Sequence, residues 1–170
     1  GFQRARQVLA RLSGSATNAA DRPAAVRAFV ADPAMGKEFP DEVELLRPIL
    51  DAAGILYVVD ASSPVEPANE AEMEILRWTG QPAMALLNRT RQRDYREQWR
   101  PVLNQFFHLV REFDAHRARF PDRVGLLRGF REIRPEWGGA IDLAVVAMER
   151  EWSERARRAV AVLAELLVGA

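Results

Sequence analysis

The feature that most constrains this chain is an unbroken apolar run, Ile55–Val59, followed by Asp60 and the helix-breaking residues Ser62–Pro64. A run of this length without polar alternation, set between turn residues, is typical of a strand buried on both faces. Two further candidate strands follow at 82–88 and 107–113, and a helical pattern fills each interval. This rhythm predicts an α/β fold with three parallel strands in chain order.

Composition excludes several classes of protein. The 170 residues are 48% hydrophobic, which excludes general disorder, and the 24 basic residues balance 24 acidic ones, so no basic excess indicates DNA binding. Cysteine is absent, which excludes disulfides and thiolate sites. No run of about 18 apolar residues indicates a membrane span. His108 and His116 have no convergent carboxylate pair, so we expect no metal site, and the expected location is the cytoplasm.

Helical patterns flank the strands. Before the first strand, we expect helices at 2–12, 23–30 and 40–53, with a turn at Met35–Lys37. After it, Asn69 is the expected N-cap of a helix that runs to Thr79 and stops at Gly80. A further helix is expected at 94–106. The sequence therefore predicts one helix between each pair of strands and several before the first.

From about Arg117 the chain reads as helical to its end, with a break at 134–139. We therefore divide it into an α/β portion at 1–116 and a helical extension at 117–170. The last helix, 139–167, carries one apolar seam of nearly heptad spacing, which predicts a packing partner. Packing within the chain is favoured, and a coiled-coil contact with another protein subunit is the alternative. The seam residues are Ile141, Val145, Met148, Trp152, Ala156, Ala159, Leu163 and Leu166.

Polar residues follow each strand, at Asp60–Ser62, at Asn88–Thr90 and at Asp114–His116. Ligands bind open parallel sheets at the carboxyl ends of the strands, so these residues are the candidate site. Each group taken alone fits an Asx or Ser turn that leaves the sheet. Five arginines after the second strand and in the first turns of the next helix form a basic cluster. We expect it to be solvated, with Glu97 as a candidate partner; an RNA- or phosphate-facing patch is the alternative. They are Arg89, Arg91, Arg93, Arg96 and Arg100.

In this order, the motifs resemble the C-terminal half of an Era/TrmE-like P-loop GTPase domain, from bacterial GTPases that carry a C-terminal helical domain of unknown function. Gly1 is similar to the glycine of the DxxG motif, and Ile55–Ala61 is similar to the strand that ends in Val-Asp-Ala. Asn88–Arg91 stands at NKxD, and Asp114–His116 at the last motif. The resemblance covers the whole chain and implies a guanine-nucleotide-binding switch.

The resemblance also implies roles for single residues. Asn88 would position the guanine base and its neighbouring loops, and Arg89 would stack its guanidinium over the base. Ala115 would offer its backbone N–H to the base oxygen, and Gly1 its N–H to the γ-phosphate. Arg91 replaces the motif aspartate, so the charge-assisted bidentate contact to guanine is missing and weaker base discrimination is expected.

The chain contains no GxxxxGK[ST] motif; Gly36-Lys37 is followed by Glu38. The economical explanation is that the P-loop half lies upstream of Gly1, so GTP or GDP and Mg²⁺ would bind the intact parent protein and not this chain alone. We assign no catalytic residue here and expect hydrolysis only in the parent. The alternative is a non-enzymatic, GTPase-derived scaffold that acts through its terminal helices. A P-loop encoded upstream would favour the switch.

Overall fold

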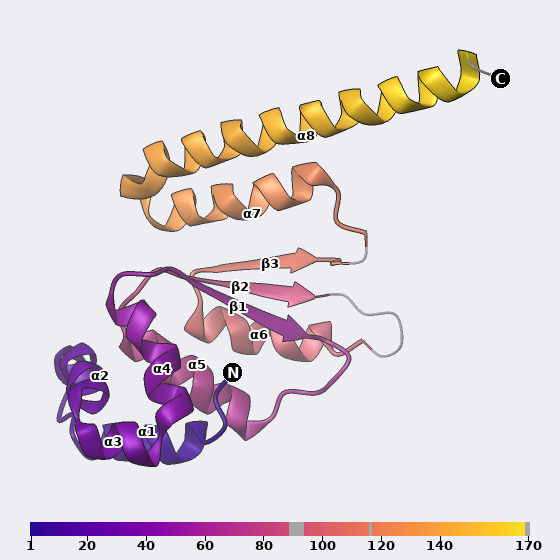
Figure 1. Cartoon of the computed structure of the whole chain (residues 1–170). Helices are drawn as coiled ribbons and strands as arrows, with labels where there is room; N and C mark the ends of the chain where they lie inside the picture. Colours follow the sequence, from indigo (N-terminus) through magenta and orange to yellow (C-terminus); the bar gives the residue numbers. More distant parts are fainter. Residues whose placement is uncertain (89–93, 116, 169–170) are drawn as a thin grey trace. The chain divides into compact units, whose positions relative to one another are not determined.

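The computed structural model describes residues 1–88, 94–115 and 117–168. The chain divides into two compact units, Gly1–His116 and Arg117–Ala170 (Figure 1). The first unit holds a three-stranded sheet with helices, and the second is helical. The predicted fold class, α/β with a three-stranded parallel sheet and a C-terminal helical extension, is confirmed.

The sheet consists of β1 (Ile55–Asp60), β2 (Ala83–Asn88) and β3 (Leu109–Phe113), in the order β1-β2-β3. Both pairings are parallel, with Tyr57 opposite Ala85 and Asn88 opposite Phe113. The carboxyl ends of all three strands therefore meet at one edge of the sheet, and β1 is a terminal strand, as the sequence predicted.

Two helices connect the strands, α5 (Pro67–Trp78) and α6 (Arg96–Phe106), and both lie on the same side of the sheet (Figure 1). Their buried side chains pack against alternate strand residues of that face. The cluster consists of Met73, Trp99, Leu103 and Phe107 with Val59, Ala61, Ala85 and Leu87. Gly80 ends α5 with a φ of +68°, a left-handed conformation that favours glycine, as predicted.

The predicted start of α5 is wrong by one turn. Glu66 is the N-cap, Pro67 opens the helix, and Asn69 lies two residues further on, where its Oδ1 accepts a hydrogen bond from the Glu66 N–H at 3.0 Å. Proline suits the first turn because its fixed φ is already helical and its missing N–H is not needed there.

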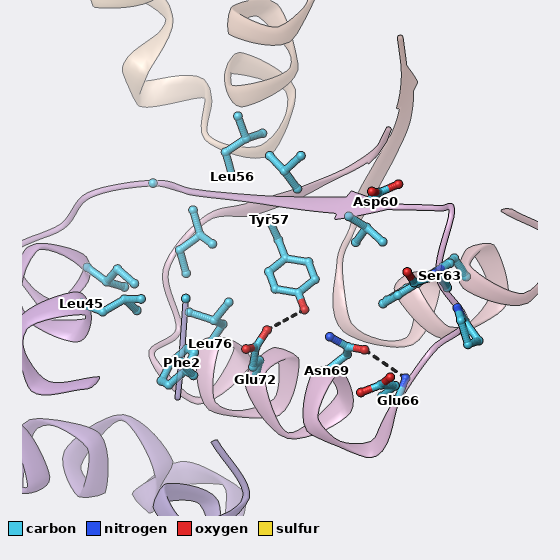
Figure 2. A pocket seen from close by; sticks show the side chains of 18 residues that line it. Phe2, Leu45, Leu56, Tyr57, Asp60, Ser63, Glu66, Asn69, Glu72 and Leu76 are labelled. Carbon is cyan, nitrogen blue, oxygen red and sulfur yellow. Dashed lines mark hydrogen bonds between the residues drawn. The ribbon is translucent and has the colours of Figure 1, made fainter. Parts of the chain in front are cut away.

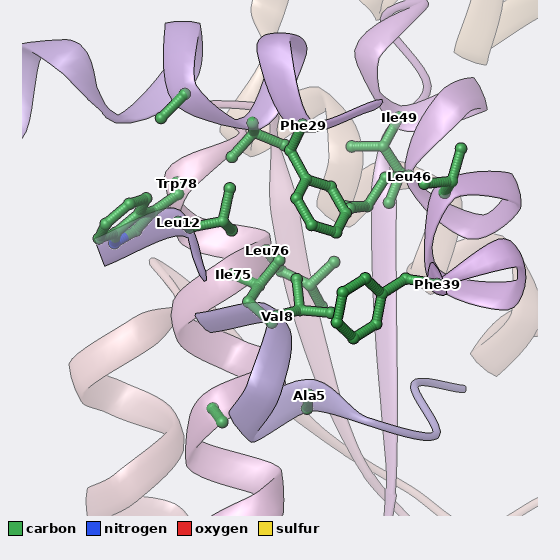
Figure 3. Packing of buried hydrophobic residues seen from close by; sticks show 14 of the residues in the cluster. Ala5, Val8, Leu12, Phe29, Phe39, Leu46, Ile49, Ile75, Leu76 and Trp78 are labelled. Atoms are coloured by element: carbon green, nitrogen blue, oxygen red, sulfur yellow. The ribbon is translucent and has the colours of Figure 1, made fainter. Parts of the chain in front are cut away.

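Four helices precede the sheet: α1 (Ala5–Ser13), α2 (Arg22–Ala31), α3 (Pro33–Glu38) and α4 (Pro40–Leu50). α1 and α2 pack on α5, and α3 and α4 pack on α2 and on each other. Together with α5 these helices bury one apolar cluster (Figure 3), whose members include Val8, Leu12, Phe29, Phe39, Leu46, Ile75 and Trp78. The predicted turn at Met35–Lys37 is wrong, because α3 runs through it; Asp32 caps that helix by accepting from the Ala34 N–H at 2.8 Å. The helix predicted at 40–53 ends at Leu50.

The second unit contains α7 (Phe120–Ile133), a 3₁₀ turn at Pro135–Trp137, and α8 (Gly138–Val168). Val124 of α7 is buried with Ile141 and Val145 of α8, and Trp152 stacks on Phe120 with ring centroids 5.0 Å apart. Within the described ranges, α8 included, no helix has the length and apolar composition needed to cross a bilayer.

The apolar seam of α8 is buried only near its start. Val145 is 5% exposed, whereas Trp152 is 53% and Leu163 59% exposed, so the expectation that the seam buries Val145, Met148, Trp152 and Leu163 together is wrong. The reason is length: at 1.5 Å per residue, the 14 residues of α7 cover about 21 Å and the 31 residues of α8 about 46 Å.

Candidate functional site

Asn88 joins the carboxyl ends of the three strands. Its backbone carbonyl accepts a hydrogen bond from the Ala61 N–H at 3.3 Å, and its side-chain Oδ1 accepts one from the Ala115 N–H at 3.2 Å. Ala61 follows β1 and Ala115 follows β3. One half-buried residue at the end of β2 therefore holds the segments that leave both neighbouring strands.

The segment after β1 is fixed by hydrogen bonds of its own. Asp60 Oδ1 accepts from the Ser62 N–H at 2.9 Å, which is the Asx turn that the sequence allowed. The Ala61 carbonyl accepts from the Tyr95 N–H at 2.9 Å, and the Ser63 carbonyl accepts from the Trp99 Nε1–H at 2.7 Å. These two bonds attach the turn to Trp99 of α6 and to Tyr95, the residue just before that helix.

The four predicted nucleotide-binding residues fall in different places. Asn88 and Ala115 are in direct contact, and the Ala115 N–H that the resemblance assigns to a base oxygen is here bonded to Asn88. Arg89 lies outside the described residues. Gly1 lines a separate feature, the groove along β1 described below.

The described part of the basic cluster is paired. Arg96 bonds Asp94 at 2.6 Å and Glu112 at 3.0 Å, and Arg100 also bonds Glu112. The partners are thus Asp94 and Glu112, and not the candidate Glu97. Hydrogen bonding to Asp94 is the main cause that raises the pKa of Arg96, which stays charged. Asp94 also accepts from the Arg96 backbone N–H at 3.2 Å, so it serves the start of α6.

A groove of about 660 Å³ runs along the outer side of β1 (Figure 2). Residues 54–60 line it together with Leu45 and Ile49 of α4 and with Gly1 and Phe2. From α5 come Asn69, Glu72 and Leu76. The groove was not anticipated from the sequence, because its lining residues lie as far apart in the chain as Gly1 and Trp99.

The groove is apolar near Phe2, Leu45 and Leu76 and polar around Glu72. The Tyr57 hydroxyl donates to Glu72 Oε2 at 2.9 Å (Figure 2). Burial, and then the charge of Glu72, raise the pKa of Tyr57, so the phenol remains a donor at neutral pH. Gly1 lies beside this pair: a Cβ placed on it would be 3.9 Å from Glu72 Oε1.

The outer edge of β1 presents backbone groups to the groove side. Ile55 N–H donates to the Pro82 carbonyl at 2.8 Å, and Ala61 N–H donates to Asn88, so the odd-numbered residues face β2. Because successive residues of a strand point their backbone groups in opposite directions, the N–H and C=O groups of Leu56 and Val58 face outward. The Leu56 and Val58 side chains are also exposed, by 41% and 59%.

Comparison with known proteins gives one match. A family described as a domain of unknown function (DUF3482) matches residues 100–170, which include the end of α6, β3 and the whole helical unit. No curated protein and no solved structure matches the chain. The description of the matched family names no activity.

Proposed function

We propose that this chain is the C-terminal half of an Era/TrmE-like GTPase domain with a helical extension, and that its intact parent is a cytoplasmic guanine-nucleotide-binding switch. The observation that carries the proposal is the hydrogen bond between Asn88 and the Ala115 N–H. It joins the two strand-end motifs that the resemblance assigns to the base, at the edge where parallel sheets bind ligands. In this role, Asn88 shapes the base pocket by holding the Ala115 segment.

The residues present fit one part of a nucleotide and not the other. Asn88 and Ala115 can serve the base, and Gly1 is the candidate that the resemblance assigns to the γ-phosphate. The sequence contains no GxxxxGK[ST] motif, which in these proteins supplies the phosphate cradle and a magnesium ligand. Phosphate and Mg²⁺ binding therefore belong to the proposed upstream half.

The open side of β1 supports the same proposal. In the GTPase order, the P-loop strand lies beside the strand that corresponds to β1. The outward backbone groups of Leu56 and Val58 offer pairing to a strand, and the groove offers room for its side chains.

The test is nucleotide binding by the intact parent, titrated with fluorescent GTP, GDP and ATP analogues in the presence of Mg²⁺. We expect guanine nucleotides to bind best, with Asn88→Ala weakening them by about 1–3 kcal/mol through loss of a base-positioning polar contact. Asn104→Ala, at an exposed position on α6, is the matched control. A strong ATP preference, or affinity unchanged by Asn88→Ala, would contradict the proposal.

A scaffold without nucleotide is the second candidate, favoured by the second half of α8. Its apolar side chains are exposed over several turns, as expected for a helix that binds a protein partner. They are Val160, Val162, Leu163, Leu166 and Leu167, between 55% and 81% exposed. A parent without an upstream P-loop, and without affinity for any of the three nucleotides, would place the scaffold ahead of the switch.

A further inference from the structure

Glu42 of α4 is a buried carboxylate without a cationic partner in the described part of the chain. It is 1% exposed. Its Oε1 accepts hydrogen bonds from the backbone N–H groups of Gln3 at 2.9 Å and Arg4 at 2.7 Å. Its Oε2 is buried and has no hydrogen-bond partner among the described residues. The carboxylate is therefore committed to the backbone just after Gly1.

Packing alone does not account for this residue. A buried carboxylate with one unsatisfied oxygen is unfavourable compared with an apolar side chain of similar size. What the carboxylate adds is an anion at the start of α1, where Arg4 is the N-cap and contributes no side-chain cap. Glu42, 38 positions after Arg4 in the sequence, thus provides the hydrogen-bond acceptor at the start of α1 that a local capping side chain would otherwise provide.

The same helix also reaches the groove. Leu45 and Ile49, on the following turns of α4, line the groove together with Gly1 and Phe2. α4 therefore holds residues 3 and 4 through the Glu42 carboxylate, and it lines the groove beside Gly1 and Phe2. A movement of the Gly1 segment has to break the Glu42 bonds or carry α4 with it.

We infer that Glu42 is the positioning residue for Gly1 and sets how strongly the parent prefers a nucleoside triphosphate over a diphosphate. This inference rests on the proposed function, in which the Gly1 N–H meets the γ-phosphate. Glu42 contacts no nucleotide; it fixes the backbone two and three residues beyond Gly1. Diphosphates lack the γ-phosphate, so their binding is independent of this arrangement.

The experiment compares affinities of the intact parent for GTPγS and GDP in the wild type, Glu42→Ala, Glu42→Gln and the control Glu44→Ala. Glu44 is an exposed glutamate on the same helix. We expect Glu42→Ala to lower the GTPγS-to-GDP preference by roughly five- to tenfold, within the usual range of coupling between sites. Glu42→Gln keeps an acceptor oxygen and should recover most of the preference, and Glu44→Ala should leave it unchanged.

Amide hydrogen exchange supplies a second readout, which needs no nucleotide. Exchange at Gln3 and Arg4 should rise in Glu42→Ala and not in Glu44→Ala. If Glu42→Ala lowers both affinities equally, or neither, the positioning role is overturned while the proposed function stands. If the wild type binds neither nucleotide, the proposed function fails, and the inference fails with it. Should Glu42→Ala not fold, Glu42→Leu removes the acceptor with a side chain of similar size, and unchanged preference with unchanged exchange at Gln3 and Arg4 in that variant would overturn the inference.

Discussion

At the scale of the residue, Glu74 shows how its partners determine the pKa of a half-buried carboxyl group. Its Oε1 accepts from the Trp78 Nε1–H at 2.8 Å and lies 3.6 Å from Arg22, and its Oε2 lies 2.5 Å from Arg77. Burial by itself would raise the pKa of Glu74. The hydrogen bonds from Arg77 and Trp78, with the charges of Arg77 and Arg22, outweigh burial and hold the pKa below its ordinary value.

This arrangement makes part of the stability pH-dependent. A carboxyl whose pKa is lower in the folded state stabilises the fold above its unfolded pKa, about 4.3, and this contribution is lost as pH falls through the folded pKa. We expect Glu74→Gln to lower the free energy of unfolding by about 1 kcal/mol at pH 7, with the difference disappearing in acid. Urea unfolding of the wild type and the variant at pH 7 and pH 3 measures this difference in the free energy of unfolding. Glu70→Gln, at an exposed position on the same helix, is the control. An equal difference at both pH values would contradict the assignment.

The sequence predicted some contacts between residues and not others. Asn88 and Ala115 could be expected to converge, because both follow strands of one parallel sheet and such strands end at the same edge. The bond between Tyr57 and Glu72 and the bonds from Glu42 to residues 3 and 4 were not predictable. The spacing of apolar residues predicts which face of α4 is buried. It does not predict which segment of the chain packs against that face.

At the scale of the element, the strands were predicted well because turn residues bound each of them, and the helices less evenly. Pro33 and Gly36 read as breakers, yet Pro33 opens α3 and Gly36 lies within it. The periodicity of α8 correctly indicated a packing face, but it carries no information about the length of the partner. The seam therefore continues past Phe120, the first residue of α7, to positions where no described residue buries it.

Two valines on α8 test this difference. Val145 is 5% exposed and packs with Ile141 and Val124, whereas Val160 is 66% exposed. Val145→Asp would bury an unpaired charge and should cost several kcal/mol of stability. Val160→Asp should stay within about 0.5 kcal/mol. Circular dichroism melts of both variants provide the comparison; a large loss for Val160→Asp would mean that the second half of α8 is covered by a partner in solution.

At the scale of the whole molecule, the sheet is asymmetric. Leu56 and Val58 of β1 pair with Met84 and Leu86 of β2. The two β2 side chains are buried, at 0% and 3% exposure, whereas Leu56 is 41% and Val58 59% exposed. Proteins commonly protect edge strands with charge or cover them, because open edges pair with other chains. β1 carries no charged side chain between Ile55 and Val59.

This asymmetry separates the two candidate functions. In the 170-residue chain, Val58→Lys should leave the melting temperature nearly unchanged, because the side chain is exposed. The added charge should reduce self-association of the chain, because it disfavours pairing at the edge of the sheet.

Val59→Lys is the buried comparison: Val59 is 4% exposed on the same strand, and the substitution should destabilise the chain strongly. If the parent supplies the P-loop strand and covers this face, Val58→Lys should destabilise the parent as well, by several kcal/mol. Thermal melts and light scattering of both proteins distinguish the two candidate functions. If Val58→Lys leaves the melting temperature unchanged in the parent as well as in the chain, the edge of β1 stays open in the parent, and the scaffold is the better account.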